Sequence, residues 1–147
     1  GKYYLICNYD KYQDVANYRI DRITNIELLH SSVKPMKEVR GLESGLDLPK
    51  HMTEHIYMFT GDPGRVRFQA KPYLITEILD WFGRDVEFTD KTEDSIIVTV
   101  YVNYKAMELW AMQYAKHIEL LSPQFLVKRI REELEEAVEK YKKRNNY

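Results

Sequence analysis

Cysteine is almost absent from the chain, since Cys7 is the one cysteine among 147 residues. A single cysteine excludes an internal disulfide. The lack of a disulfide framework is typical of proteins of a reducing compartment, so we expect a cytoplasmic location. Because Cys7 lies in an apolar segment, we interpret it as a small core residue and not as a reactive thiol.

Long apolar runs are also absent. No segment approaches the about 18 to 20 apolar residues that a membrane-spanning helix needs. The first residues lack the charged and then apolar pattern of a secretory signal. The chain opens directly on residues typical of a strand, from which we expect a fragment of a longer polypeptide.

Neither sign of charge dominates, because 22 basic and 23 acidic residues leave a net charge of −1. Any nucleic-acid contact must therefore come from a local patch of cations. No nucleophile–base pair or carboxylate dyad stands out, so we predict that the chain is not an enzyme and uses no cofactor. His51 and His55 have the i, i+4 spacing of a zinc site, but no cysteine lies near, and we interpret them as solvent-facing.

A dense turn cluster, Gly61-Asp62-Pro63-Gly64, separates two patterned regions. Before it, the pattern predicts strands at 3–9 and 16–22, an extended continuation at 23–29, a loop at 31–47 and a short helix at 49–59. This gives a meander of two or three antiparallel strands. Asp47 is the expected N-cap of the short helix.

After the turn cluster, strands alternate with helices. The pattern predicts strands at 65–70, 86–89, 95–102 and 117–121, helices at 72–81 and 104–115, and a long helix after Ser122-Pro123. The order β-α-β-β-α-β is that of the ferredoxin-like arrangement. The long helix carries an apolar stripe of Val127, Ile130, Leu134, Val138 and Tyr141.

Several segments, taken in order, resemble the WYL-domain transcriptional regulators of bacteria. Lys2-Tyr3-Tyr4-Leu5 is similar to the Trp-Tyr-Leu signature of that family, and Tyr18-Arg19-Ile20-Asp21-Arg22-Ile23 is similar to its Phe-Arg-Leu-Asp-Arg-Ile strand. The segments 110–114, 121–123 and 129–134 are similar to the C-terminal extension that usually follows a WYL domain. The resemblance covers nearly the whole chain.

The resemblance implies an α+β fold class, with a partial SH3-like or Sm-like β-barrel followed by a ferredoxin-like extension and a long C-terminal helix. Residues 1–46 are then the C-terminal part of the WYL domain, 47–63 a linker with a short helix, and 64–147 the extension. The first barrel strands and the usual helix-turn-helix domain are missing, so we expect operator DNA to be read only through that missing domain. An open barrel edge favours pairing with another copy, and we expect a homodimer.

The resemblance places the ligand site on the strand that carries Arg19 and Arg22. A guanidinium offers a planar fork of donors suited to phosphate or carboxylate, and it stacks on aromatic rings and bases. The alternative is that Asp21 simply pairs with one arginine on a solvated strand. Because side chains alternate between strand faces, both arginines reach one pocket only if the strand bulges or ends near Asp21.

Tyr3 and Tyr4 point to opposite faces of their strand. We expect one of them in the core and the other available for stacking, with Tyr4 favoured as the pocket residue. Lys2 either adds charge at the rim of the pocket or is simply solvated. Tyr18 is expected in the barrel core.

These observations favour a ligand-sensing and dimerisation module of a bacterial transcriptional regulator. Its expected effector is a nucleotide or a single-stranded nucleic acid. The alternative is a purely structural oligomerisation module, in which the sheet edge and the C-terminal helix hold subunits together and the arginines make interface ion pairs.

Overall fold

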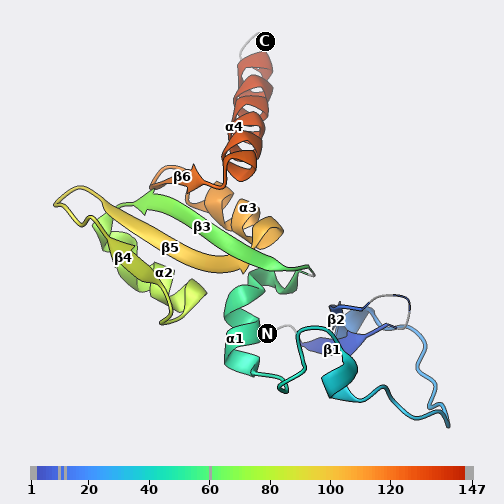
Figure 1. Ribbon diagram of the computed structural model, residues 1–147. Coiled ribbons are helices and arrows are strands. Elements are labelled where there is room, and N and C mark those ends of the chain that lie inside the picture. Colours follow the sequence, from blue (N-terminus) through green and yellow to red (C-terminus); the bar gives the residue numbers. More distant parts are fainter. Residues whose placement is uncertain (1–2, 10, 12, 60, 145–147) are drawn as a thin grey trace.

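The computed structural model describes residues 3–9, 11, 13–59 and 61–144. The described residues form two antiparallel sheets and four α-helices, so the predicted α+β class is confirmed. An N-terminal hairpin and a four-stranded sheet are joined by a loop and a short helix (Figure 1).

The hairpin consists of β1 (Tyr4–Asn8) and β2 (Val15–Arg19). Tyr4 pairs with Arg19 and Leu5 pairs with Tyr18. Since successive side chains alternate between faces, Tyr4, Asn17 and Arg19 share one face of the hairpin, and Leu5 and Tyr18 share the other.

The second strand ends three residues earlier than the sequence predicts. A 3₁₀ turn, η1 (Ile20–Arg22), follows Arg19 directly, and the N–H of Ile23 donates to the carbonyl of Ile20 at 3.2 Å. The strand prediction for 20–22 is wrong, because the chain turns directly after the N–H of Ile20 donates to the carbonyl of Tyr3 at 3.0 Å. Residues 23–29 have no regular structure either, so the described part of the hairpin holds two strands and not three.

The connection to the sheet begins with a loop that contains one 3₁₀ turn, η2 (Met36–Glu38). Helix α1 (Leu48–Glu54) follows, and the carboxylate of Asp47 accepts a hydrogen bond from the N–H of Lys50 at 3.1 Å. The predicted N-cap is thus confirmed. A third 3₁₀ turn, η3 (Ile56–Met58), leads toward the sheet.

The larger sheet is antiparallel, with the spatial order β4-β5-β3-β6. Its strands are β3 (Pro63–Ala70), β4 (Glu87–Thr89), β5 (Ile96–Asn103) and β6 (Ile118–Ser122). The helices are α2 (Ile75–Phe82), preceded by the 3₁₀ turn η4 (Pro72–Leu74), then α3 (Tyr104–Gln113) and α4 (Gln124–Arg144). Each strand and helix predicted after the turn cluster is therefore present, with small shifts at its ends.

An aromatic cluster fills the core between one face of this sheet and the helices α2 and α3. The ring of Trp110 lies 5.4 Å from that of Phe68 and 4.8 Å from that of Phe82, centroid to centroid. All three side chains are buried. Such tilted and edge-on contacts stabilise more than their buried area alone, so this cluster makes the sheet and its two helices one unit.

Helix α4 extends away from the sheet (Figure 1). Its first two turns are anchored, because Leu126 and Ile130 are buried and Arg129 donates to Glu108 of α3 at 2.9 Å. Farther along its apolar stripe, Leu134, Val138 and Tyr141 are exposed. Among the described residues, no helix has the length and apolar character to cross a membrane.

Candidate functional site

Asp21 holds the guanidinium of Arg19 at the end of β2. Nε of Arg19 donates to Oδ1 of Asp21 at 2.9 Å, and Nη2 donates to Oδ2. This hydrogen bonding raises the pKa of Arg19 and lowers the pKa of Asp21, which the positive charge of Arg22 lowers further. The three residues therefore form a cation–carboxylate–cation sequence on the strand end and the turn that follows it.

The ion pair leaves part of Arg19 available. A guanidinium carries five N–H donors, and Asp21 engages two of the N–H bonds, so three remain for another acceptor. Because Arg22 lies in the turn and not in the strand, the alternation of strand faces does not separate it from Arg19. The strand thus ends close to Asp21, and the convergence of both arginines on one site stays a prediction.

The two tyrosines of the signature differ in exposure. Tyr4 is half-buried and lies directly opposite Arg19, whereas the ring of Tyr3 is 79% exposed. Lys2, the remaining predicted site residue, lies outside the described residues. Of the two tyrosines, Tyr4 is therefore the one that lies on the same hairpin face as Arg19.

Tyr18 does not lie in a core, contrary to the expectation from the sequence. Its side chain is half exposed, beside the exposed Leu5 on the hairpin face opposite to Arg19. The prediction is wrong for a physical reason: within the described part of the chain, the hairpin is a two-stranded sheet, and these two side chains meet no third strand.

His51 is buried, so the interpretation of this residue as solvent-facing is wrong. Its Nε2 lies 3.1 Å from Oδ1 of Asn17, which places the ring of α1 against the Arg19 face of the hairpin. The ring also stacks on His55, with centroids 4.4 Å apart. Burial, and then the neighbouring imidazole, lower the pKa of His51. The neutral ring is therefore the favoured form.

Arg40 links the hairpin to the larger sheet. Its N–H donates to the carbonyl of Gln13 at 3.2 Å, and its guanidinium bonds Asp14 at 2.5 Å and Asp62 at 3.5 Å. Asp14 belongs to the hairpin turn, and Asp62 precedes β3 directly. These pairs are exposed and contribute little to stability, but they connect the hairpin turn with the residue before β3.

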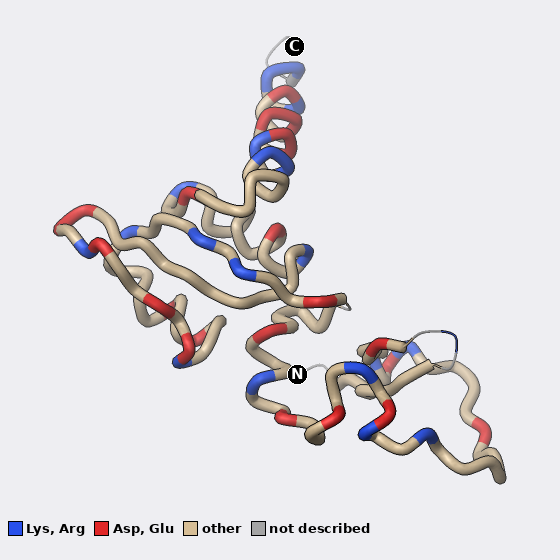
Figure 2. Tube along the Cα trace, viewed as in Figure 1, with Lys and Arg blue, Asp and Glu red and all other residues tan. Residues whose placement is uncertain are grey.

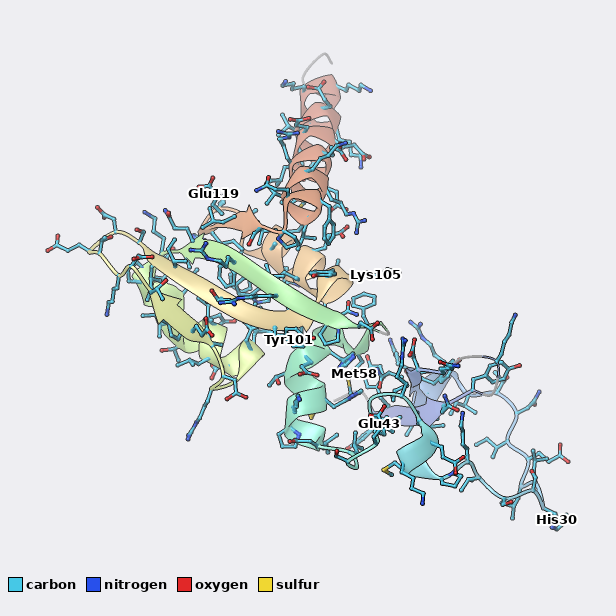
Figure 3. The ribbon with its side chains drawn as sticks, in the orientation of Figure 1. His30, Glu43, Met58, Tyr101, Lys105 and Glu119 are labelled. Atoms are coloured by element: carbon cyan, nitrogen blue, oxygen red, sulfur yellow. The ribbon has the colours of Figure 1, made fainter. Side chains whose placement is uncertain are left out.

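Arg40 and His51 line a cleft of about 700 Å³ between the hairpin turn, the 40–47 loop, α1 and the beginning of β3. Figure 3 shows Glu43 on the loop side of this region and Tyr101 on the sheet side. The remaining charged or titratable side chains of the lining are Asp14, Asp47, Lys50, Glu54, His55 and Asp62. The volume is in the range that small ligands occupy.

Sequence reasoning missed this cleft because its residues are contributed by segments far apart in the chain. The one local signal was the i, i+4 spacing of His51 in α1 and His55 directly after it. Their rings stack on each other, and among the described residues no group of three or more His, Cys, Asp or Glu side chains could hold a metal ion. The cleft is therefore a polar cavity without the features of a metal site.

Comparison with known proteins identified one family. The model of the WCX domain matches residues 62–138, just over half of the chain, from the residue before β3 into the distal half of α4. No curated protein matched the chain.

Proposed function

The chain belongs to the WCX domain family, the WYL-associated C-terminal domains, and from this premise we propose that it is the ligand-sensing and dimerisation module of a WYL-type bacterial transcriptional regulator. WYL and WCX domains are regulatory and not catalytic families. The observation that carries the proposal is the cation–carboxylate–cation sequence of Arg19, Asp21 and Arg22 at the end of β2.

The proposed effector is a nucleotide or a single-stranded nucleic acid. Arg19 retains three N–H donors for a phosphate oxygen, and its guanidinium is already oriented by Asp21. Tyr4 lies opposite Arg19 and supplies an aromatic face for a base. Tyr3, whose side chain is 79% exposed, and Lys2 are the remaining residues of the proposed site.

A continuous set of contacts leads from this site to the larger sheet. Asn17 lies on the same hairpin face as Arg19 and contacts His51 of α1. Helix α1 in turn precedes β3, the strand with which the WCX match begins. An effector that binds the hairpin better in one arrangement of the two parts shifts the population toward that arrangement. In a homodimer of the proposed parent regulator, this shift changes the relative position of its DNA-binding domains, through which operator DNA is read.

The domain assignment belongs to the same proposal. The element order β-α-β-β-α-β and the sheet order β4-β5-β3-β6 support a ferredoxin-like fold for 64–147. The exposed face of Leu5 and Tyr18 supports the view that 1–46 is part of an SH3-like or Sm-like barrel, whose other strands cover such a face. Residues 47–63 form the linker between them.

The effector assignment is tested by fluorescence anisotropy with short labelled single-stranded DNA and RNA at several salt concentrations. If Arg19 and Arg22 each contact a phosphate, the Arg19→Ala/Arg22→Ala variant binds more weakly, and the slope of log K against log salt falls by about 1 to 2 units. The Arg84→Ala/Lys91→Ala variant removes the same charge from exposed positions of the second half and serves as the control.

An unchanged slope in the hairpin variant, or an equal loss in the control, contradicts the assignment. Circular dichroism of each variant separates lost binding from lost folding.

The alternative function is a purely structural oligomerisation module. One observation favours it: Asp21 already accepts hydrogen bonds from the guanidinium of Arg19, as expected if this arginine only makes ion pairs. A folded chain that forms dimers but binds neither DNA, RNA nor mononucleotides supports this alternative.

A further inference from the structure

The distal part of α4 is an unsupported helix with an apolar face. Beyond the anchored first two turns, Leu134, Val138 and Tyr141 are 36%, 50% and 73% exposed and share one stripe. Isolated helical segments are marginal in water, and ion pairs within the helix, such as that of Lys140 with Glu136 at 2.7 Å, contribute little. A helix of this kind is stabilised mainly by tertiary packing of its apolar face.

The apolar stripe continues into a groove at the base of α4. The groove has a volume of about 480 Å³, and its apolar wall includes Ala115, Ile118, Val127, Ile130, Leu134 and Val138. Leu134 and Val138 belong both to the groove and to the exposed stripe. An occupant of the stripe therefore also reaches the groove.

Charge is distributed unevenly along α4. The segment 128–131 is mainly basic, 132–136 is mainly acidic, and 140–143 is again mainly basic, as Figure 2 shows by alternating blue and red. A parallel pair of such helices would bring like charges together. An antiparallel pair instead places the distal basic segment of each helix beside the acidic segment of the other.

We propose that α4 pairs antiparallel with α4 of a second copy of this chain, about a two-fold axis between Ala137 and Val138. In this register Leu134 lies opposite Tyr141 of the second copy, and Ala137 lies opposite Val138. These residues fall within about 100° of one another on the helix wheel, so one stripe of each copy is covered. The tyrosine reaches the mouth of the groove, which Leu134 lines.

The flanking charges are satisfied in the same register. On one side of the stripe, Lys140 lies between Glu133 and Glu136 of the second copy, and the symmetry repeats this contact. A side-chain hydrogen bond with Glu108 of α3, and then burial, raise the pKa of Glu133. A lysine from the second copy places a positive charge beside this carboxyl group.

This inference rests on the homodimer of the proposed function and specifies where its subunits meet. It is tested on the full chain by sedimentation velocity over a range of protein concentrations. The parent chain forms a dimer, and the Leu134→Asp/Val138→Asp variant sediments as a monomer. The control is Leu79→Asp on α2, which replaces a leucine of nearly the same exposure, 37%, and leaves the dimer intact.

A charge exchange tests the register itself. The Lys140→Glu variant and the Glu133→Lys/Glu136→Lys variant each bring like charges together in a homodimer, so each dimerises at least about tenfold more weakly than the parent. An equimolar mixture of the two variants places opposite charges together at every contact. We therefore expect the mixture to form a heterodimer with near-parental affinity.

If these residues acted only within one copy of the chain, mixing the two variants would not recover the dimer affinity. A monomeric parent chain, a dimer that tolerates both aspartates, or a mixture that stays monomeric overturns the proposal. Anisotropy with single-stranded DNA, run on the same samples, tests the hairpin separately. A monomer that still binds DNA overturns this inference and leaves the effector assignment standing.

Discussion

Asp21 limits what its two neighbouring arginines can bind. Any phosphate at this site must be accepted by the N–H donors that Asp21 does not use, and it must tolerate a carboxylate whose lowered pKa keeps it ionised. We therefore expect the proposed site to favour a ligand with several separated anionic groups over a single phosphate, because one group can meet Arg19 and another Arg22. This is the pattern that a nucleic-acid backbone offers.

His51 makes the stability of the chain sensitive to acid. Its pKa in the folded state lies below the usual 6.5, so the unfolded state binds more protons as the pH falls. The stabilisation is complete above pH 6.5 and is lost progressively as the pH falls toward the lowered pKa. We expect the free energy of unfolding to decrease below pH 6.5, and the His51→Gln variant to show a shallower decrease.

Urea denaturation at a series of pH values between about 7 and 5 measures this difference. Gln retains a donor for Asn17, and His30→Gln in the exposed loop is the matched control. Equal slopes for the parent chain and His51→Gln would show that the buried imidazole is not responsible.

The junction of β3, α3 and α4 depends on a glycine. A Cβ added to Gly64 would lie 1.9 Å from the hydroxyl oxygen of Tyr104 and 2.2 Å from its ring. To turn aside, that ring must leave its edge-on contact with Phe125 of α4, in which the centroids are 5.0 Å apart. The absence of a side chain at this position therefore allows the first turn of α3 to approach the strand.

We expect Gly64→Ala to lower the free energy of unfolding by roughly 1 to 3 kcal/mol, the usual cost of overpacking. Urea denaturation provides the measurement, and Gln69→Ala at an exposed position of the same strand provides the comparison. If the double variant Gly64→Ala/Tyr104→Leu is less destabilised than the sum of the two single variants, the clash with Tyr104 is the cause. An additive double variant would contradict this explanation.

Local sequence pattern predicted those elements whose formation depends on neighbouring residues. The stripe of α4, the cap at Asp47 and the alternation of β3 all depend on spacings of a few residues. The end of β2 was missed because the sequence through Arg22 remains compatible with a strand, and only the hydrogen bond from Ile23 to Ile20 decides for a turn.

The site could be predicted only in part, for a related reason. Arg19, Asp21 and Arg22 are close in sequence, so their association was visible there. The burial of His51 depends on Asn17, which lies 34 residues away, and the cleft depends on contacts of Arg40 with Asp14 and Asp62. Contacts of such separation leave no periodic signal in one sequence.

For the whole molecule, effector binding and dimerisation are expected to be coupled. If saturating single-stranded DNA changes the dissociation constant of the dimer, then dimerisation changes the affinity for DNA by the same factor, because linkage is reciprocal. We expect a factor of about 5 to 150, the usual range of such coupling.

Sedimentation with and without DNA measures one side of this relation, and anisotropy on the parent chain and on Leu134→Asp/Val138→Asp measures the other. Identical dissociation constants with and without DNA would show that the hairpin and α4 act independently.

The length of α4 has a mechanical consequence. A helix of 21 residues is about 30 Å long, and only its first two turns are fixed to the core. The packed base of α4 is therefore short and its exposed part is long, so a tilt of roughly 10° at the base moves the tip by about 5 Å. Rearrangements too small to alter the packing around Trp110 could thus be amplified into a displacement as long as a full helical turn.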